Sequence, residues 1–130
     1  MKTRRLLVLA FVICFALAQT AALAGGSHGH SQVSKMAKVL IHLNHFPSGS
    51  EKNMLSDIAN DSSVSDHERT IASAIKNLNH KASSADKKRL SAIISDSSAP
   101  QSVRDLARIV HDLNHKPSGS DKKTLQAMIH

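Results

Sequence analysis

The chain has 130 residues, with 17 lysines and arginines, 10 aspartates and glutamates and nine histidines, and its formal net charge is +7 with neutral histidines. It contains one cysteine and three phenylalanines but no tryptophan or tyrosine. Proteins that bind single-stranded nucleic acid normally stack the bases on aromatic side chains, so this composition argues against a nucleic-acid partner.

Residues 1–24 have the pattern of a cleaved secretory signal peptide. Lys2, Arg4 and Arg5 precede an apolar run at residues 6–18, and an Ala-Leu-Ala sequence at residues 22–24 suits signal peptidase. The alternative, a membrane anchor, needs about 20 apolar residues to cross the bilayer, and this run has only 13. We therefore expect export to the periplasm or the extracellular space, with no transmembrane segment after cleavage.

The expected exported chain differs from the precursor in charge and in cysteine content. It has 14 basic and 10 acidic residues, a net charge of +4, and Cys14 is lost with the signal. Thiol catalysis, disulfides and cysteine ligation of zinc are thus excluded for it. We expect residues 25–34 to form a flexible tail rich in histidine, glycine and serine together with the start of a helix, and residues 35–130 to form one domain.

A repeat of 35 residues organises this domain into segments 36–70, 71–105 and 106–130. Each repeat has two apolar stripes at helical spacing, which predict two antiparallel helices, here called A and B. The A stripes are Met36/Ile71/Leu106, Val39/Ala74/Ile109, Leu40/Ile75/Val110 and Leu43/Leu78/Leu113, and the B stripes are Leu55/Leu90/Leu125, Ile58/Ile93/Met128 and Ala59/Ile94/Ile129. The predicted fold is all-α, a short solenoid-like stack of about six helices.

Capping motifs and prolines mark the ends of these helices. A serine followed three residues later by an acid or glutamine is typical of a helix N-terminus. The motif predicts B helices beginning after Ser48, Ser83 and Ser118, and A helices beginning after Ser65 and Ser98. Pro47 and Pro117 are expected to end the A helices before them, because the residue before a proline is disfavoured in the helical region.

One segment, residues 90–113, resembles a HEAT-type unit. Such units follow an apolar helix with an aspartate and then a Val-Arg-x-x-Ala start to the next helix, and Asp96, Val103, Arg104 and Ala107 occupy these places. The preceding copy departs from the pattern because Glu68 stands where valine is expected. The resemblance implies a protein-binding scaffold rather than an enzyme. The sequence also lacks a nucleophile elbow and a phosphate-binding glycine loop, which agrees with a protein that is not an enzyme.

The loop between helices A and B occurs in three similar copies, LNHFPSGSEKN, LNHKASSADKK and LNHKPSGSDKK. On a purely structural interpretation the asparagine, histidine and serine end one helix and start the next. On a functional interpretation the loops form a basic edge that binds an anionic or protein partner of the cell envelope. Its residues are Lys52, Lys81, Lys87, Lys88, Arg89, Lys116, Lys122 and Lys123, with His45, His80 and His115 beside them.

Histidine-based metal binding is the alternative function. His28 and His30 could chelate Cu, Ni or Zn near the expected new N-terminus, and His111 and His115 have the i, i+4 spacing of a chelating pair on a helix. His42 and His45 are a similar i, i+3 pair. In an open stack the equivalent histidines of the three loops are not expected to share one ion, because packed helices lie about 8–10 Å apart.

The last B helix suggests self-association. Its apolar residues Leu125, Met128 and Ile129 lie at the end of the sequence, with no later helix to cover them in an open stack. Exposed apolar patches favour association, so a homodimer is expected.

Overall fold

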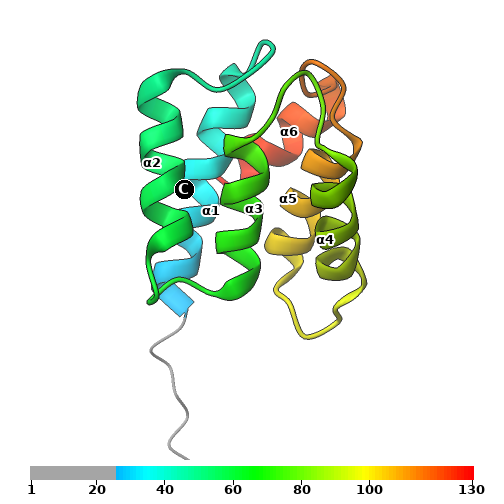
Figure 1. The fold of residues 1–130 in the computed structure, drawn as a ribbon. Helices are drawn as coiled ribbons and strands as arrows, with labels where there is room; N and C mark the ends of the chain where they lie inside the picture. Colours follow the sequence, from blue (N-terminus) through cyan, green and yellow to red (C-terminus); the bar gives the residue numbers. More distant parts are fainter. Residues whose placement is uncertain (1–25) are drawn as a thin grey trace, which may run out of the picture.

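The computed structural model describes residues 26–130, and these residues form six α-helices without a β-strand (Figure 1). The helices are α1 (Gly26–His42), α2 (Gly49–Asn60), α3 (Asp66–Lys76), α4 (Ser84–Ser95), α5 (Gln101–Asp112) and α6 (Gly119–Ala127). The all-α prediction is therefore confirmed for this part of the chain. The predicted signal peptide lies outside the described residues.

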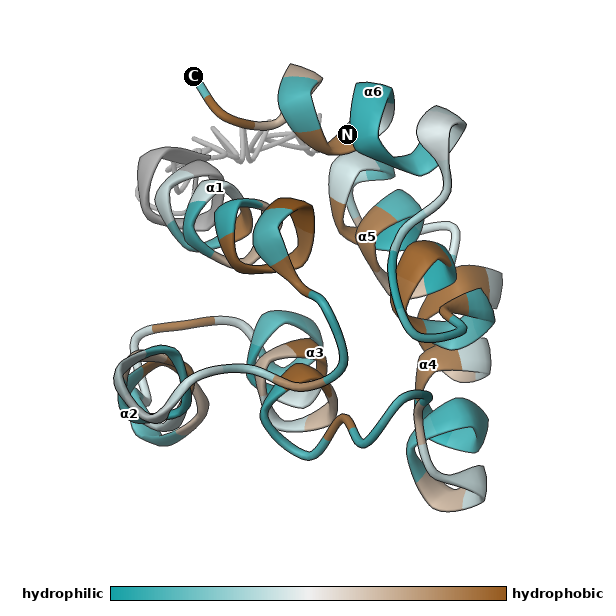
Figure 2. Cartoon of the chain, turned by 90° about the horizontal axis from the view of Figure 1, so that it is seen from above, coloured by the Kyte–Doolittle hydropathy of each residue, from teal (hydrophilic) through white to brown (hydrophobic). Residues whose placement is uncertain are grey.

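The three A helices, α1, α3 and α5, pack against one another, and the B helices lie outside them (Figure 2). Each B helix fits against two A helices: α2 contacts α1 and α3, and α4 contacts α3 and α5. The last, α6, contacts α5 and returns to α1. Because of this return contact the arrangement is closed, whereas an open stack would leave α1 and α6 apart.

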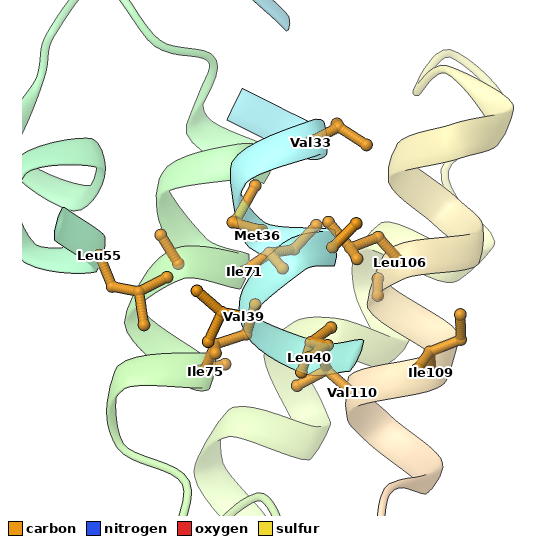
Figure 3. Packing of buried hydrophobic residues seen from close by; sticks show 14 of the residues in the cluster. Val33, Met36, Val39, Leu40, Leu55, Ile71, Ile75, Leu106, Ile109 and Val110 are labelled. Atoms are coloured by element: carbon orange, nitrogen blue, oxygen red, sulfur yellow. The ribbon is translucent and has the colours of Figure 1, made fainter. Parts of the chain in front are cut away.

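The predicted apolar stripes form one continuous core (Figure 3). All twelve residues of the predicted A stripes are buried. In the B stripes, Leu55, Leu90 and Leu125 are fully buried, while Met128 and Ile129 are half-buried against the core. Burying a leucine side chain contributes about 1.5–3 kcal/mol, so the helical periodicity supplies the main stabilisation of the fold.

Four of the five predicted serine caps are confirmed. The side chains of Ser48, Ser65, Ser83 and Ser118 each accept a hydrogen bond from the backbone N–H three residues later. The prediction for Ser98 is wrong, because α5 has Pro100 at its N-cap and no side-chain cap. Pro100 is the residue that aligns with Ser65 in the 35-residue repeat, and Ser98 instead donates hydrogen bonds to Asp96 Oδ1.

The prolines do not end the A helices. Helices α1 and α5 end at His42 and Asp112, five residues before Pro47 and Pro117. Helix α3 ends one residue earlier in the repeat although Ala82 stands in the proline position. All three residues, Pro47, Ala82 and Pro117, are buried, so their common role is to cover the core beneath the loops.

The apolar face of the last helix, α6, packs on other helices, whereas an open stack would leave that face exposed. Leu125 is fully buried, because α6 packs on α1 and α5. The homodimer stays a prediction, which now rests on the half-buried Met128 and Ile129 alone. No helix within residues 26–130 combines the length and the hydropathy that crossing a membrane would require.

Candidate metal centre

The three A–B loops lie at the same end of the helices (Figure 1), and hydrogen bonds between backbone groups connect them. The N–H of His80 donates to the carbonyl oxygen of His45, with an N···O distance of 3.0 Å, and the N–H of His115 donates to the carbonyl oxygen of His80 at 2.6 Å. The same residue of each repeat therefore connects one loop to the next. This backbone ladder brings three histidines from distant parts of the sequence together.

The turn that holds two of these histidines has an uncommon backbone conformation. His80 and His115 both have φ of 65°, and within residues 26–130 they are the only residues with positive φ. Each is flanked by an antiparallel bridge, Asn79 with Lys81 and Asn114 with Lys116. Left-handed backbone costs a non-glycine residue about 1–2 kcal/mol. A side chain retained at such a position is a reason to look for a function.

The imidazole rings of His45, His80 and His115, here called the histidine triad, contact one another. The ring centroids are separated by 5.1 Å for His45 and His80, 5.7 Å for His45 and His115, and 4.8 Å for His80 and His115. The Nδ1 atoms of His80 and His115 are 2.9 Å apart. One of these two rings must donate a proton and the other must accept it, because the distance is that of a hydrogen bond.

The triad has the donor set of a metal site, and its ligand atoms lie somewhat farther apart than in a metal-bound site. One ring nitrogen from each histidine can be chosen so that all three lie within 4.8 Å of one another. In a tetrahedral zinc site with Zn–N distances of about 2.0–2.1 Å, ligand nitrogens are about 3.3 Å apart. Small rotations of the exposed rings would reach that spacing. Three imidazoles would leave one coordination position for water or another ligand.

This arrangement corrects the expectation that the three loop histidines cannot share an ion. That expectation took the distance between histidines from the axial spacing of helices in an open stack. In the structure the A helices surround a common axis and the loops meet over it, so the rings approach more closely than the helices. The occurrence of histidine at the same place in all three repeats was the sequence signal for the triad.

The histidine pairs predicted on helices are not formed. Helix α5 ends at Asp112, so His115 lies beyond it and does not share a helical face with His111. His111 Nδ1 instead lies 2.6 Å from Asp112 Oδ1. His45 is likewise outside α1, which ends at His42. The prediction of His115 as a ligand fits the triad, but with different partners.

The predicted N-terminal ligands lie at the other end of the molecule. The backbone of His28 and His30 belongs to the first turns of α1. This helix has 17 residues and spans about 25 Å at 1.5 Å per residue, whereas the triad follows its C-terminus. The N-terminal histidines and the triad are therefore two separate hypotheses for metal binding.

The predicted basic edge is largely accessible to solvent. Seven of its eight lysine and arginine residues are exposed, and Lys87 is half-buried. Arg89 is the one member that forms an ion pair within the described residues, 3.7 Å from Asp86. The other seven residues form no ion pair within residues 26–130.

No known protein family, curated protein or solved structure matches the chain.

Proposed function

We propose that this protein binds a divalent transition metal, zinc, copper or nickel, through the histidine triad. The observation that carries the proposal is the convergence of one ring nitrogen from each histidine to within 4.8 Å of the others. Imidazole is a suitable ligand for all three metals. On this proposal, each of the three helical hairpins contributes one ligand.

The backbone at the triad supports this function over a purely structural role for the loops. Glycine or asparagine would adopt the left-handed conformation at positions 80 and 115 with less strain than most residues. Histidine stands there twice, and both rings contact the other histidines of the triad at the surface rather than entering the core. A loop selected only for its turn would not need an imidazole at each of these places.

Metal titration of the purified protein tests the proposal. The background variant carries His28→Ala and His30→Ala, so that the N-terminal histidines do not contribute. Isothermal calorimetry with zinc, and absorption spectroscopy with cobalt as a tetrahedral probe, should give one ion per chain. Alanine at any one of His45, His80 and His115 should weaken binding by about tenfold or more.

His111→Ala is the matched control. It removes a histidine from the same end of α5 without touching the triad, so the affinity should stay unchanged. If the three triad variants bind zinc as tightly as the background variant, the triad is not the site. If restoring His28 and His30 accounts for all the binding, the metal function belongs to the N-terminus.

A second proposal, favoured by the common location of the A–B loops, is that the basic edge binds an anionic or protein partner after export. Reversing the charges of Lys87, Lys88, Lys122 and Lys123 should weaken binding to anionic vesicles or acidic polypeptides and reduce its dependence on salt. Reversal at Lys35 and Lys38, which lie on α1, is the control. Equal effects of the two sets would contradict a localised edge.

A further inference from the structure

A surface pocket of about 430 Å³ lies between the first two hairpins, next to the triad. It is lined by Phe46, Lys52, Lys76, Asn77, Leu78 and Asn79. Two of these residues are the immediate chain neighbours of triad histidines, Phe46 of His45 and Asn79 of His80. The pocket is thus formed by the same loops that build the candidate metal centre.

The aromatic side chain in this pocket breaks the repeat. The equivalent positions in the second and third loops are lysines, Lys81 and Lys116, but the first loop has Phe46. Its side chain is 60% exposed, and it is the one large apolar side chain left exposed within the described residues. A phenyl ring exposed at the edge of a pocket can contact a flat apolar ligand without disturbing the core.

Two ammonium groups give the pocket a positive charge. The Nζ atom of Lys52 lies 5.7 Å from the centroid of the Phe46 ring, and Lys76 lines the same pocket. Neither lysine forms an ion pair within residues 26–130. The side-chain amides of Asn77 and Asn79 add hydrogen-bond donors that a carboxylate can use.

A second pocket, which lies within the third hairpin between α5 and α6, has the opposite character. This pocket, about 240 Å³, is lined by Asp105, Asp112 and Asp121 together with a single arginine, Arg108. Arg108 pairs with Asp105 at 2.8 Å. The exposed aromatic ring beside unpaired lysines is particular to the pocket at Phe46, because the residues that align with Phe46 in the other two loops are lysines.

We propose that the pocket at Phe46 binds a small organic anion with a flat apolar group, that is, an aromatic carboxylate. The carboxylate contacts Lys52, Lys76 and the asparagine amides, and the apolar group packs on the Phe46 ring. This binding goes beyond the metal function and does not require it, because no triad histidine lines the pocket.

Benzoate is the probe, and NMR titration of the metal-free protein at constant ionic strength is the measurement. Benzoate should give saturable shifts of the backbone amides of Phe46 and Asn79 with a Kd in the millimolar range. Acetate, which lacks the ring, and benzylamine, which lacks the negative charge, should bind more weakly. Phe46→Ala and Lys52→Gln should each weaken benzoate by about fivefold.

Lys87→Gln is the matched control, since Lys87 aligns with Lys52 one repeat later and does not line the pocket. It should leave the benzoate affinity unchanged. Phe46 and Lys52 are exposed, so their variants are expected to fold, and far-UV circular dichroism verifies this. Any of three results would overturn the proposal: equal binding of benzoate and acetate, equal weakening of benzoate binding by Lys52→Gln and Lys87→Gln, or amide shifts that do not saturate. Zinc binding measured on the same variants reports on the triad separately.

Discussion

His80 and His115 are 35 residues apart in the chain, yet their Nδ1 atoms lie 2.9 Å from each other. Their backbones are joined as well, by the hydrogen bond from the N–H of His115 to the carbonyl oxygen of His80. Both residues have the same φ of 65°. The contact therefore arises because two copies of one turn meet near the axis around which the A helices pack, with His45 of the first loop completing the triad.

The left-handed backbone at two of the three triad histidines predicts which of two substitutions, glycine or alanine, gives the more stable variant at each position. At His80 and His115, where φ is positive, glycine should give a more stable metal-free protein than alanine by about 0.5–1 kcal/mol. His45 is not among the positive-φ residues, so the His45→Gly protein should be less stable than the His45→Ala protein. Urea unfolding of the six variants measures this. The same order at all three positions would contradict the turn conformation described here.

Metal binding should stabilise the junction between the first and last hairpins. The described backbone ladder joins the first loop to the second and the second to the third, while α6 is the shortest helix and contributes one buried residue, Leu125. Zinc held by His45 and His115 would connect α1 with α6. At a free zinc concentration about 100 times Kd, amide exchange in α6 should slow by up to about 100-fold.

Hydrogen exchange followed by mass spectrometry measures this effect, and the His115→Ala variant is its control. The variant should show no protection of α6 by zinc. If zinc binds the unmodified protein with full occupancy and the exchange of α6 does not change, the metal does not connect the two hairpins.

The protein should lose stability at acidic pH because of Asp96, which lies in the turn after α4. Hydrogen bonds from the Ser98 hydroxyl and backbone N–H, followed by the nearby His67, lower the pKa of Asp96 below its usual value. Because the folded-state pKa is lower than the unfolded one, the ionised carboxylate stabilises the fold above about pH 4. That contribution is lost as the pH falls through the folded-state pKa.

Ser98→Ala should raise the pKa of Asp96 toward its usual value and lower stability at pH 7. The difference in stability between this variant and the unmodified protein should disappear in strong acid, because Asp96 is then protonated in both proteins. NMR titration of the Asp96 side chain and urea unfolding at both pH values measure this. Ser63→Ala, which removes the matching hydroxyl hydrogen bond to Asp61, should leave the Asp96 pKa unchanged. A shift in both variants would point to a change in the whole fold.

Glu68 occupies a position in α3 that belongs to the core. The aligned residues of α1 and α5 are Val33 and Val103, and all three are buried. Oε2 of Glu68 accepts a hydrogen bond from the Ser65 hydroxyl, but Oε1 is buried without a partner. A buried unsatisfied polar group costs about 1–3 kcal/mol. Glu68→Val should therefore raise the free energy of unfolding by about 1 kcal/mol.

Chemical denaturation measures the effect of Glu68→Val. Glu51→Val is the matched control, since Glu51 has the same place in the first turn of α2 but completes a capping box with Ser48. That variant should be less stable by about 0.5–1 kcal/mol. A loss of stability for Glu68→Val would show that the buried carboxylate is needed where it lies.

The helices and four of their N-termini could be predicted from the sequence alone. An apolar residue every three or four positions is enough to produce a helix with one buried face, and the stripes from Met36 to Leu125 are buried as predicted. Serine caps act over three residues, so Ser48, Ser65, Ser83 and Ser118 could be recognised locally. The same motif at Ser98 predicts a cap that is not formed, because Pro100 stands at the aligned N-cap position of α5.

Neither the closure of the helical arrangement nor the cluster on its axis could be predicted from the sequence. Closure depends on the angles at which helices pack, summed over three hairpins, and no local pattern states that sum. Once α6 returns to α1, residues 35 positions apart are brought together, and His45, His80 and His115 become one cluster. Their approach also needs the left-handed turn at His80 and His115, a backbone conformation that the sequence of the loops does not require.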